Sequence, residues 1–194
     1  MPTFPARWPG LVAPAFLYEN TGRSSQGGRN DNGSMDNRTD KQTLLSAGLL
    51  FSMNLDDLNR VGLIKIWPKN ESCVENMLQC AKRKLADAVA SSLSNASRFL
   101  IAYDVILQCT LAALYLQGYQ PNWDRPRVEK TMLMTLPHSL GFSHQKILTL
   151  TSLWQVKIDA EILGADIDED VVELCIFEGN EMIKLFYDWL GERH

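Results

Sequence analysis

The stretch "RFLIAYDVILQCTLAALYLQGYQP", residues 98–121, decides the fold of this chain. It is apolar on most faces of a helix, yet it has Asp104 in its middle. A membrane-spanning helix needs about 20 residues with few polar interruptions, and Arg98, Asp104 and Gln108 interrupt this one. Its flanks also lack the clustered Lys and Arg residues of a topogenic loop. We therefore predict no membrane span, and we expect the central helix of a soluble bundle.

The residues before this stretch predict one short and one long helix. Asn54 or Asp56 is placed to cap the short helix, and Gly62 is placed to end it. The long helix covers residues 70–91, where apolar side chains recur at helical spacing. Asn70 is its expected N-cap, with an acidic residue in the first turn.

The residues after this stretch predict three further helices. A short helix covers residues 127–136, and Pro137 is expected to stop it. A long helix begins at a Ser143 cap and ends at Gly164. A final long helix follows an acidic cap at Asp166 or Asp168, and its aromatic residues are expected in the core or in a dimer contact rather than in a ligand cage. These aromatic residues are Phe177, Phe186, Tyr187 and Trp189.

The helical pattern as a whole predicts an all-α fold. No stretch alternates long enough for a sheet, and there is no glycine-rich phosphate loop and no internal repeat. Four long helices joined by short links predict an up-down-up-down four-helix bundle, and residues 53–194 are expected to form it.

Residues 1–52 differ in composition from the rest of the chain. Much of this segment is rich in Gly, Ser, Asn and Arg and has few apolar residues to offset its ordering entropy. The prediction is a disordered, dispensable N-terminal extension that precedes a second start at Met53. A genuine flexible arm is the alternative, and residues 43–52, "TLLSAGLLFS", have the composition of a short helix leading into Met53.

Composition excludes several classes of site. The net charge of −4 gives no global basic field for binding nucleic acid, so RNA binding would need a local patch. The four cysteines match no zinc-ribbon spacing and are interpreted as buried thiols in a reducing cytoplasm. The three histidines are scattered, so no metal site and no cofactor are predicted.

The order of several short sequence motifs resembles that of the HEPN superfamily, and in particular of its small stand-alone bacterial proteins. The stretch that decides the fold, with its "GYQP" ending, is followed by "TMLMTLPHSLG", then by "LTSLWQVKIDAEILG", and then by a last helix that ends in "YDWL". The resemblance covers residues 53–192.

This resemblance implies a HEPN-like four-helix bundle that forms a homodimer and associates with RNA. Many members of the superfamily are metal-independent ribonucleases, many are toxins paired with a nucleotidyltransferase-type antitoxin, and others are non-catalytic binding modules. The active motif of the superfamily is an Arg, a polar residue next to it, and a His or Tyr a few residues later. In a dimer two copies of this motif cut RNA by acid–base chemistry, with the adjacent 2′-hydroxyl as nucleophile.

The chain departs from that motif at three positions on the third long helix. Lys157 stands at the Arg position, Ile158 replaces the expected Asn, and Ile162 replaces the expected Tyr or His. The preceding loop also lacks the His pair that often follows its proline, because Pro126 is followed by Arg127. Lysine lacks the planar bidentate fork of arginine, and isoleucine transfers no proton. We therefore predict that ribonuclease activity is lost.

Seven residues are the candidates for a surviving site. Lys157, Asp159 and Glu161 are the catalytic candidates, with Lys157 interpreted either as a remnant phosphate contact or as a solvated helix residue. The nucleic-acid-binding candidates form a short basic cluster beside an aromatic ring, a composition that can hold single-stranded RNA but also fits a solvated loop. They are Trp123, Arg125, Arg127 and Lys130.

Two interpretations of Asp104 stay open. It is either a buried acid that orients a basic or polar partner near the former active face, or an acid at the edge of the bundle that reaches water or pairs with a Lys or Arg.

The sequence thus predicts a cytoplasmic, non-catalytic HEPN-like protein that acts through RNA or a protein partner, in a toxin–antitoxin or defence system. Two alternatives stay open. One is a metal-independent ribonuclease toxin with a divergent active site, and the other is a structural homodimeric interaction module.

Overall fold

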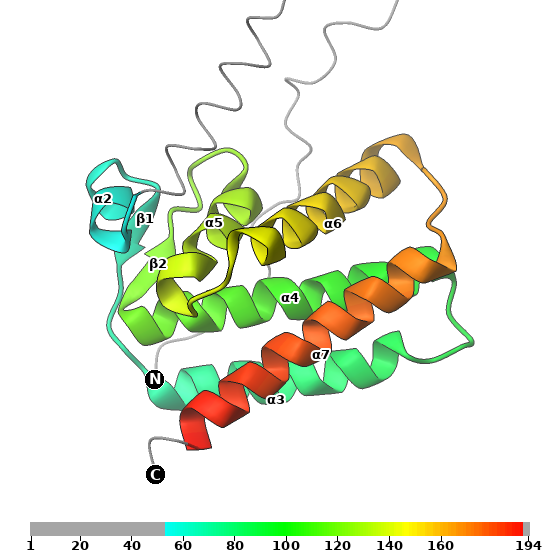
Figure 1. Cartoon of the computed structure of the whole chain (residues 1–194), viewed down its shortest axis with the longest axis horizontal. Helices are drawn as coiled ribbons and strands as arrows, with labels where there is room; N and C mark the ends of the chain where they lie inside the picture. Colours follow the sequence, from blue (N-terminus) through cyan, green and yellow to red (C-terminus); the bar gives the residue numbers. More distant parts are fainter. Residues whose placement is uncertain (1–52, 192–194) are drawn as a thin grey trace, which may run out of the picture.

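The computed structural model describes residues 53–191, and within this range the chain is mostly helical (Figure 1). The predicted N-terminal extension, residues 1–52, lies outside the described residues. The described range holds six helices and one small two-stranded sheet. The all-α prediction is therefore confirmed for the part of the chain that the structure describes.

Helix α4, Asn95–Gln117, runs through the middle of the fold. Helices α3, Glu71–Ala88, and α7, Glu169–Gly191, pack against one side of it. Helices α5, Val128–Ser139, and α6, His144–Leu163, pack against the other side (Figure 1). The stretch that decides the fold is thus surrounded by the other long helices.

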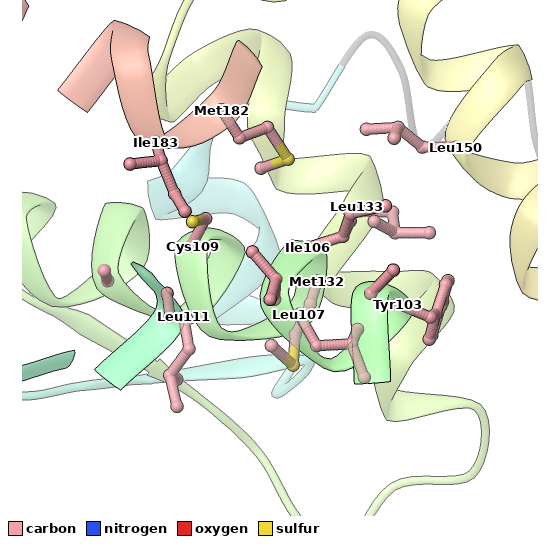
Figure 2. Packing of buried hydrophobic residues seen from close by; sticks show 14 of the residues in the cluster. Tyr103, Ile106, Leu107, Cys109, Leu111, Met132, Leu133, Leu150, Met182 and Ile183 are labelled. Carbon is pink, nitrogen blue, oxygen red and sulfur yellow. The ribbon is translucent and has the colours of Figure 1, made fainter. Parts of the chain in front are cut away.

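The core forms where side chains of these helices meet around α4 (Figure 2). Ile106 of α4 lies among Leu133 of α5, Leu150 of α6 and Met182 of α7, and all four side chains are buried. By length and composition α4 alone among the described helices could cross a membrane, but 72% of its apolar window is buried inside the protein. The helix therefore has the burial of a core helix.

Side-chain caps begin two helices where the sequence predicted them. The side chain of Asn70 accepts a hydrogen bond from the backbone N–H of Cys73 at 3.0 Å, and that of Asn54 accepts one from Asp57 at 2.9 Å. Gly118 ends α4 with φ of 85°, in the left-handed region that glycine adopts without steric cost. The predicted caps at Asn54 and Asn70 are confirmed.

Helix α5 differs from the prediction at its end. Pro137 was expected to stop it, but the helix continues to Ser139. A proline removes one helical hydrogen bond, and here it stands in the last turn, where few such bonds remain to be broken. The Ser139 hydroxyl donates to the carbonyl of Thr135 at 3.0 Å, which holds this final turn.

The prediction of no sheet is wrong. Strand β1, Ile64–Ile66, pairs with strand β2, Tyr119–Pro121, in an antiparallel register that places Ile66 opposite Tyr119. Three residues are too few to produce a detectable alternation in the sequence. The pair forms because the left-handed turn at Gly118 directs the chain back along β1, where Trp67 donates to the Gly118 carbonyl at 2.9 Å.

Arg98 ties three helices together at the other end of α4. Its Nε donates to the carbonyl of Ala88 at the end of α3, at 3.0 Å. Its two terminal nitrogens donate to Glu169 at 2.5 Å and Glu173 at 2.6 Å in the first turns of α7. These two bonds raise the pKa of Arg98, and the guanidinium fork fixes where α7 starts relative to α3 and α4.

The cysteines are only partly as predicted. Cys109 and Cys175 are buried, whereas Cys73 and Cys80 on α3 are half-exposed. Burial raises the pKa of Cys109 to about 12, and it also raises the pKa of Cys175. A raised pKa leaves little of the thiolate that reacts with disulfide reagents.

We predict that a thiol-specific disulfide reagent at pH 8 modifies at most two of the four cysteines of the folded chain. Mass spectrometry should place the label on Cys73 and Cys80, and unfolding in guanidinium should release the other two thiols. Fast labelling of Cys109 in the folded chain would contradict the described core.

Gly179 of α7 lies close against α4. A Cβ atom at this position would lie 3.2 Å from Cγ1 of Val105, 3.5 Å from Cδ1 of Leu85 and 3.6 Å from the Ala102 carbonyl oxygen. Glycine is unfavourable inside a helix by about 1 kcal/mol relative to alanine. Its presence here allows close backbone packing between α7 and α4.

We predict that Gly179→Leu lowers the free energy of unfolding by about 1–3 kcal/mol, because overpacking separates α7 from α4. Leucine is a strong helix former, so a loss of stability reports on packing rather than on propensity. Gly179→Ala is the control, and it should change stability by less than about 1 kcal/mol, because gained propensity offsets the 3.2 Å contact. Equal urea midpoints for the Leu variant and the unmodified chain would contradict this packing.

Candidate functional site

The residue at the key motif position, Lys157, lies in a buried ionic cluster. Its side chain is 7% exposed, and its Nζ donates to both carboxylate oxygens of Glu129 at 2.8 and 3.1 Å. Glu161, one helical turn further along α6, places an oxygen 3.3 Å from the same nitrogen. An ammonium group has three N–H donors, and the hydrogen bonds to Glu129 use two of them.

Tyr103 of α4 closes the apolar side of this cluster. Its side chain is fully buried, and its ring centroid lies 5.8 Å from Lys157 Nζ, within the range of a cation–π contact. Burial raises the pKa of Tyr103 strongly, and the negative charge of Glu129 raises it further. The Tyr103 hydroxyl has no hydrogen-bond partner among the described residues.

The cluster combines one ammonium group with the carboxylates of Glu129 and Glu161, so its formal charge is 1 − 2 = −1. The two carboxylates are partly exposed, whereas the ammonium group lies behind them. A negatively charged opening repels phosphate, and the charge of Lys157 is already offset by two carboxylates. The arrangement therefore holds α5 against α6 and disfavours the binding of a phosphate.

Neither earlier interpretation of Lys157 describes this environment. The solvated helix residue is wrong, because the side chain is buried. The remnant phosphate contact stays a prediction, and the two carboxylates disfavour it. The contact between Lys157 and Glu129 joins residues 28 positions apart, which no local spacing rule detects.

Asp159 does not join the other two catalytic candidates. It accepts a hydrogen bond from Gln155 Nε2 at 2.9 Å, and no described bond links it to Lys157. Residues two apart on a helix point in different directions, whereas residues four apart share a face. The structure thus brings Lys157 and Glu161 together and leaves Asp159 on another face of α6.

Two members of the predicted RNA-binding cluster make contacts within the protein. Arg125 donates to the backbone carbonyls of Gly62 at 3.1 Å and Val61 at 3.4 Å, so its guanidinium holds the turn after α2. Lys130 lies over the ring of Trp154, with Nζ 5.4 Å from the centroid.

Two further members of this cluster lie on the surface. Trp123 is 36% exposed, and Arg127 is an exposed residue with φ of 55° in the turn that begins α5. RNA binding by these residues stays a prediction, although Arg125 and Lys130 already make contacts within the protein.

Asp104 is not a buried acid. Its side chain is 46% exposed, and it accepts a hydrogen bond from Lys84 Nζ of α3 at 2.7 Å. The interpretation as an acid at the edge of the bundle, paired with a lysine, is confirmed. The bond joins α3 to α4 at the surface.

The last helix presents an apolar surface that the sequence did not predict. Phe186 is buried as expected, but Phe177 is 56% exposed. Leu174 and Leu185 are also exposed, and the three side chains fall on one face of α7 by helical spacing. Asp170, Glu181 and Asp188 lie on the same face. Trp189 falls among the residues whose side chains are not described.

No cluster of three or more His, Cys, Asp or Glu side chains suited to a metal ion occurs within residues 53–188. Comparison of the chain with protein-family models finds no match. Comparisons with curated proteins and with solved structures find no match either. The functional proposal therefore rests on the residues of this chain and on the resemblance noted from its sequence.

We predict a double-mutant coupling energy of about 1–3 kcal/mol between Lys157 and Glu129, measured by urea unfolding of Lys157→Met, Glu129→Gln and the double variant. Methionine fills the volume of the buried lysine stem, so the cycle reports on charge rather than on a cavity. The exposed pair Lys65–Asp124 is the control, with Nζ 3.0 Å from the carboxylate oxygen, and its coupling should be close to zero. A coupling no larger than that of the control would contradict a structural ionic cluster.

Proposed function

We propose that this protein is a non-catalytic, HEPN-like helical-bundle protein that acts by binding a protein partner. The observation that carries the proposal is the state of Lys157. The residue at the motif position that should contact RNA phosphate is buried and bound by Glu129 and Glu161. We further propose that the helical fold is an up-down-up-down bundle, with α3, α4, α6 and α7 as its four long helices.

The exposed face of α7 is the surface proposed for the partner. Leu174, Phe177 and Leu185 supply apolar area in the open, and apolar side chains gathered on one exposed face are typical of an interaction site. Acids outnumber bases at this face. Asp170, Glu181 and Asp188 stand beside two lysines, Lys184 and Lys146, and Lys146 Nζ lies 5.9 Å from the centroid of the Phe177 ring. This chemistry fits an amphipathic helix with an apolar stripe flanked by Lys and Arg.

We also propose that the protein forms a homodimer, and that the two copies contact each other through a surface other than the α7 face. Antiparallel pairing of two α7 helices about a two-fold axis near Gly179 would bring Asp170 of one copy against Asp188 of the other. Like charges placed opposite each other disfavour such a pairing. A cytoplasmic location, a toxin–antitoxin or defence setting and a nucleotidyltransferase-type partner follow from the resemblance and are kept as proposals.

The test is binding of a labelled leucine–lysine amphipathic helical peptide, measured by fluorescence anisotropy at physiological salt. We expect the Phe177→Asp variant to bind at least about tenfold more weakly than the unmodified chain, which corresponds to about 1.4 kcal/mol. Leu163→Asp is the matched control, because Leu163 is also exposed but lies at the far end of α6, and its affinity should be unchanged. A second peptide with Glu in place of Lys should bind more weakly.

A parallel assay with single-stranded RNA in EDTA addresses the ribonuclease alternative. We expect no cleavage by the unmodified chain. Cleavage that is lost in Lys157→Met and retained in Asp159→Asn would overturn the non-catalytic proposal and return Lys157 to a catalytic role. Peptide binding that ignores both Phe177→Asp and the peptide charge would overturn the α7 surface.

A further inference from the structure

The small sheet leaves one of its apolar side chains uncovered. Ile64 is fully buried, whereas Ile66 is 73% exposed. Side chains two residues apart on a strand point to the same face, so the face that is buried at Ile64 extends into solvent at Ile66. Tyr119 stands directly opposite Ile66 in the antiparallel pair, and directly paired residues share a face.

Helix α2, Leu55–Arg60, covers only the inner part of this face. Its Leu58 is fully buried, as is Ile64, and the Leu58 carbonyl accepts a hydrogen bond from the backbone N–H of Leu63 at 2.9 Å. The Tyr119 hydroxyl donates to the Asp56 carboxylate in the first turn of α2. This bond places the N-terminal end of α2 beside the pair that Ile66 forms with Tyr119.

The chain that precedes α2 therefore begins at the edge where Ile66 is uncovered. The ten residues before Met53, residues 43–52, read "TLLSAGLLFS" and are mostly apolar, unlike the polar stretch before them. Leu45 and Leu49 are four apart and would share one face of a helix. Ten helical residues span about 15 Å, so this segment can cover only surface close to the start of α2.

We propose that residues 43–52 dock as a helix against Ile66 and Tyr119, with Leu45 and Leu49 toward the sheet. The segment would then extend the layer that α2 begins and complete the apolar cover of this face. The proposal is independent of the α7 surface and of any catalytic role. It also makes this part of the N-terminal extension a structural element of the domain instead of a dispensable one.

The experiment is amide hydrogen exchange of the full chain, followed by mass spectrometry of peptides from residues 22–52. We expect residues 43–52 to exchange at least about tenfold more slowly than residues 22–42, since a docked helix protects its amides from exchange. Ile66→Asp should abolish this difference, because a carboxylate on the docking face would be desolvated. Leu163→Asp is the matched control, since Leu163 is 74% exposed on α6, and it should leave the protection intact.

Two outcomes would overturn the proposal. One is exchange of residues 43–52 as fast as that of residues 22–42, or protection that persists in Ile66→Asp. The other is protection that increases with protein concentration in parallel with dimer mass on a light-scattering column, which would place the segment on a second copy of the chain. Circular dichroism of Ile66→Asp should retain the helical signal of the unmodified chain, so that a loss of protection reports on docking and not on unfolding.

Discussion

Burial of α4 on nearly all its sides is the constraint on which the rest of this structure depends. A helix that is apolar all round must be surrounded, so α3 and α7 cover one side and α5 and α6 cover the other. Charged groups on such a helix need a partner or solvent. Arg98 has its carboxylates at the start of α7, and Asp104 has Lys84 at the surface.

The same demand explains the ionic cluster beside Tyr103. Lys157 points toward the core from α6, and an ammonium group so placed needs counter-charges that remain bound to it. Glu129 and Glu161 supply them, and the cation–π contact with Tyr103 adds an attraction from the apolar side. A lysine bound in this way stabilises the packing of α5 against α6. Its ammonium group is correspondingly less accessible to the RNA phosphate that its motif position suggested as a ligand.

Apolar side chains that are not buried in the core lie at two surfaces. The outer face of α7 exposes Phe177 among acidic residues, and the small sheet exposes Ile66 beside the first turn of α2. The residues around each surface favour a different binding partner. The α7 face has the charge for a separate basic partner, whereas Ile66 lies within reach of the apolar segment that directly precedes α2 in the same chain.

The sequence by itself determined that these helices form and where several of them begin, because caps such as Asn70 and Ser143 act through neighbouring backbone groups and their signals are local. It also determined that α4 is central, since its composition permits no other soluble placement. The tertiary structure alone decided the β1–β2 pair, the exposure of Phe177 and the partners of Lys157 and Asp104. Each of these depends on groups far apart in the chain, and periodicity and spacing describe only one helix or strand at a time.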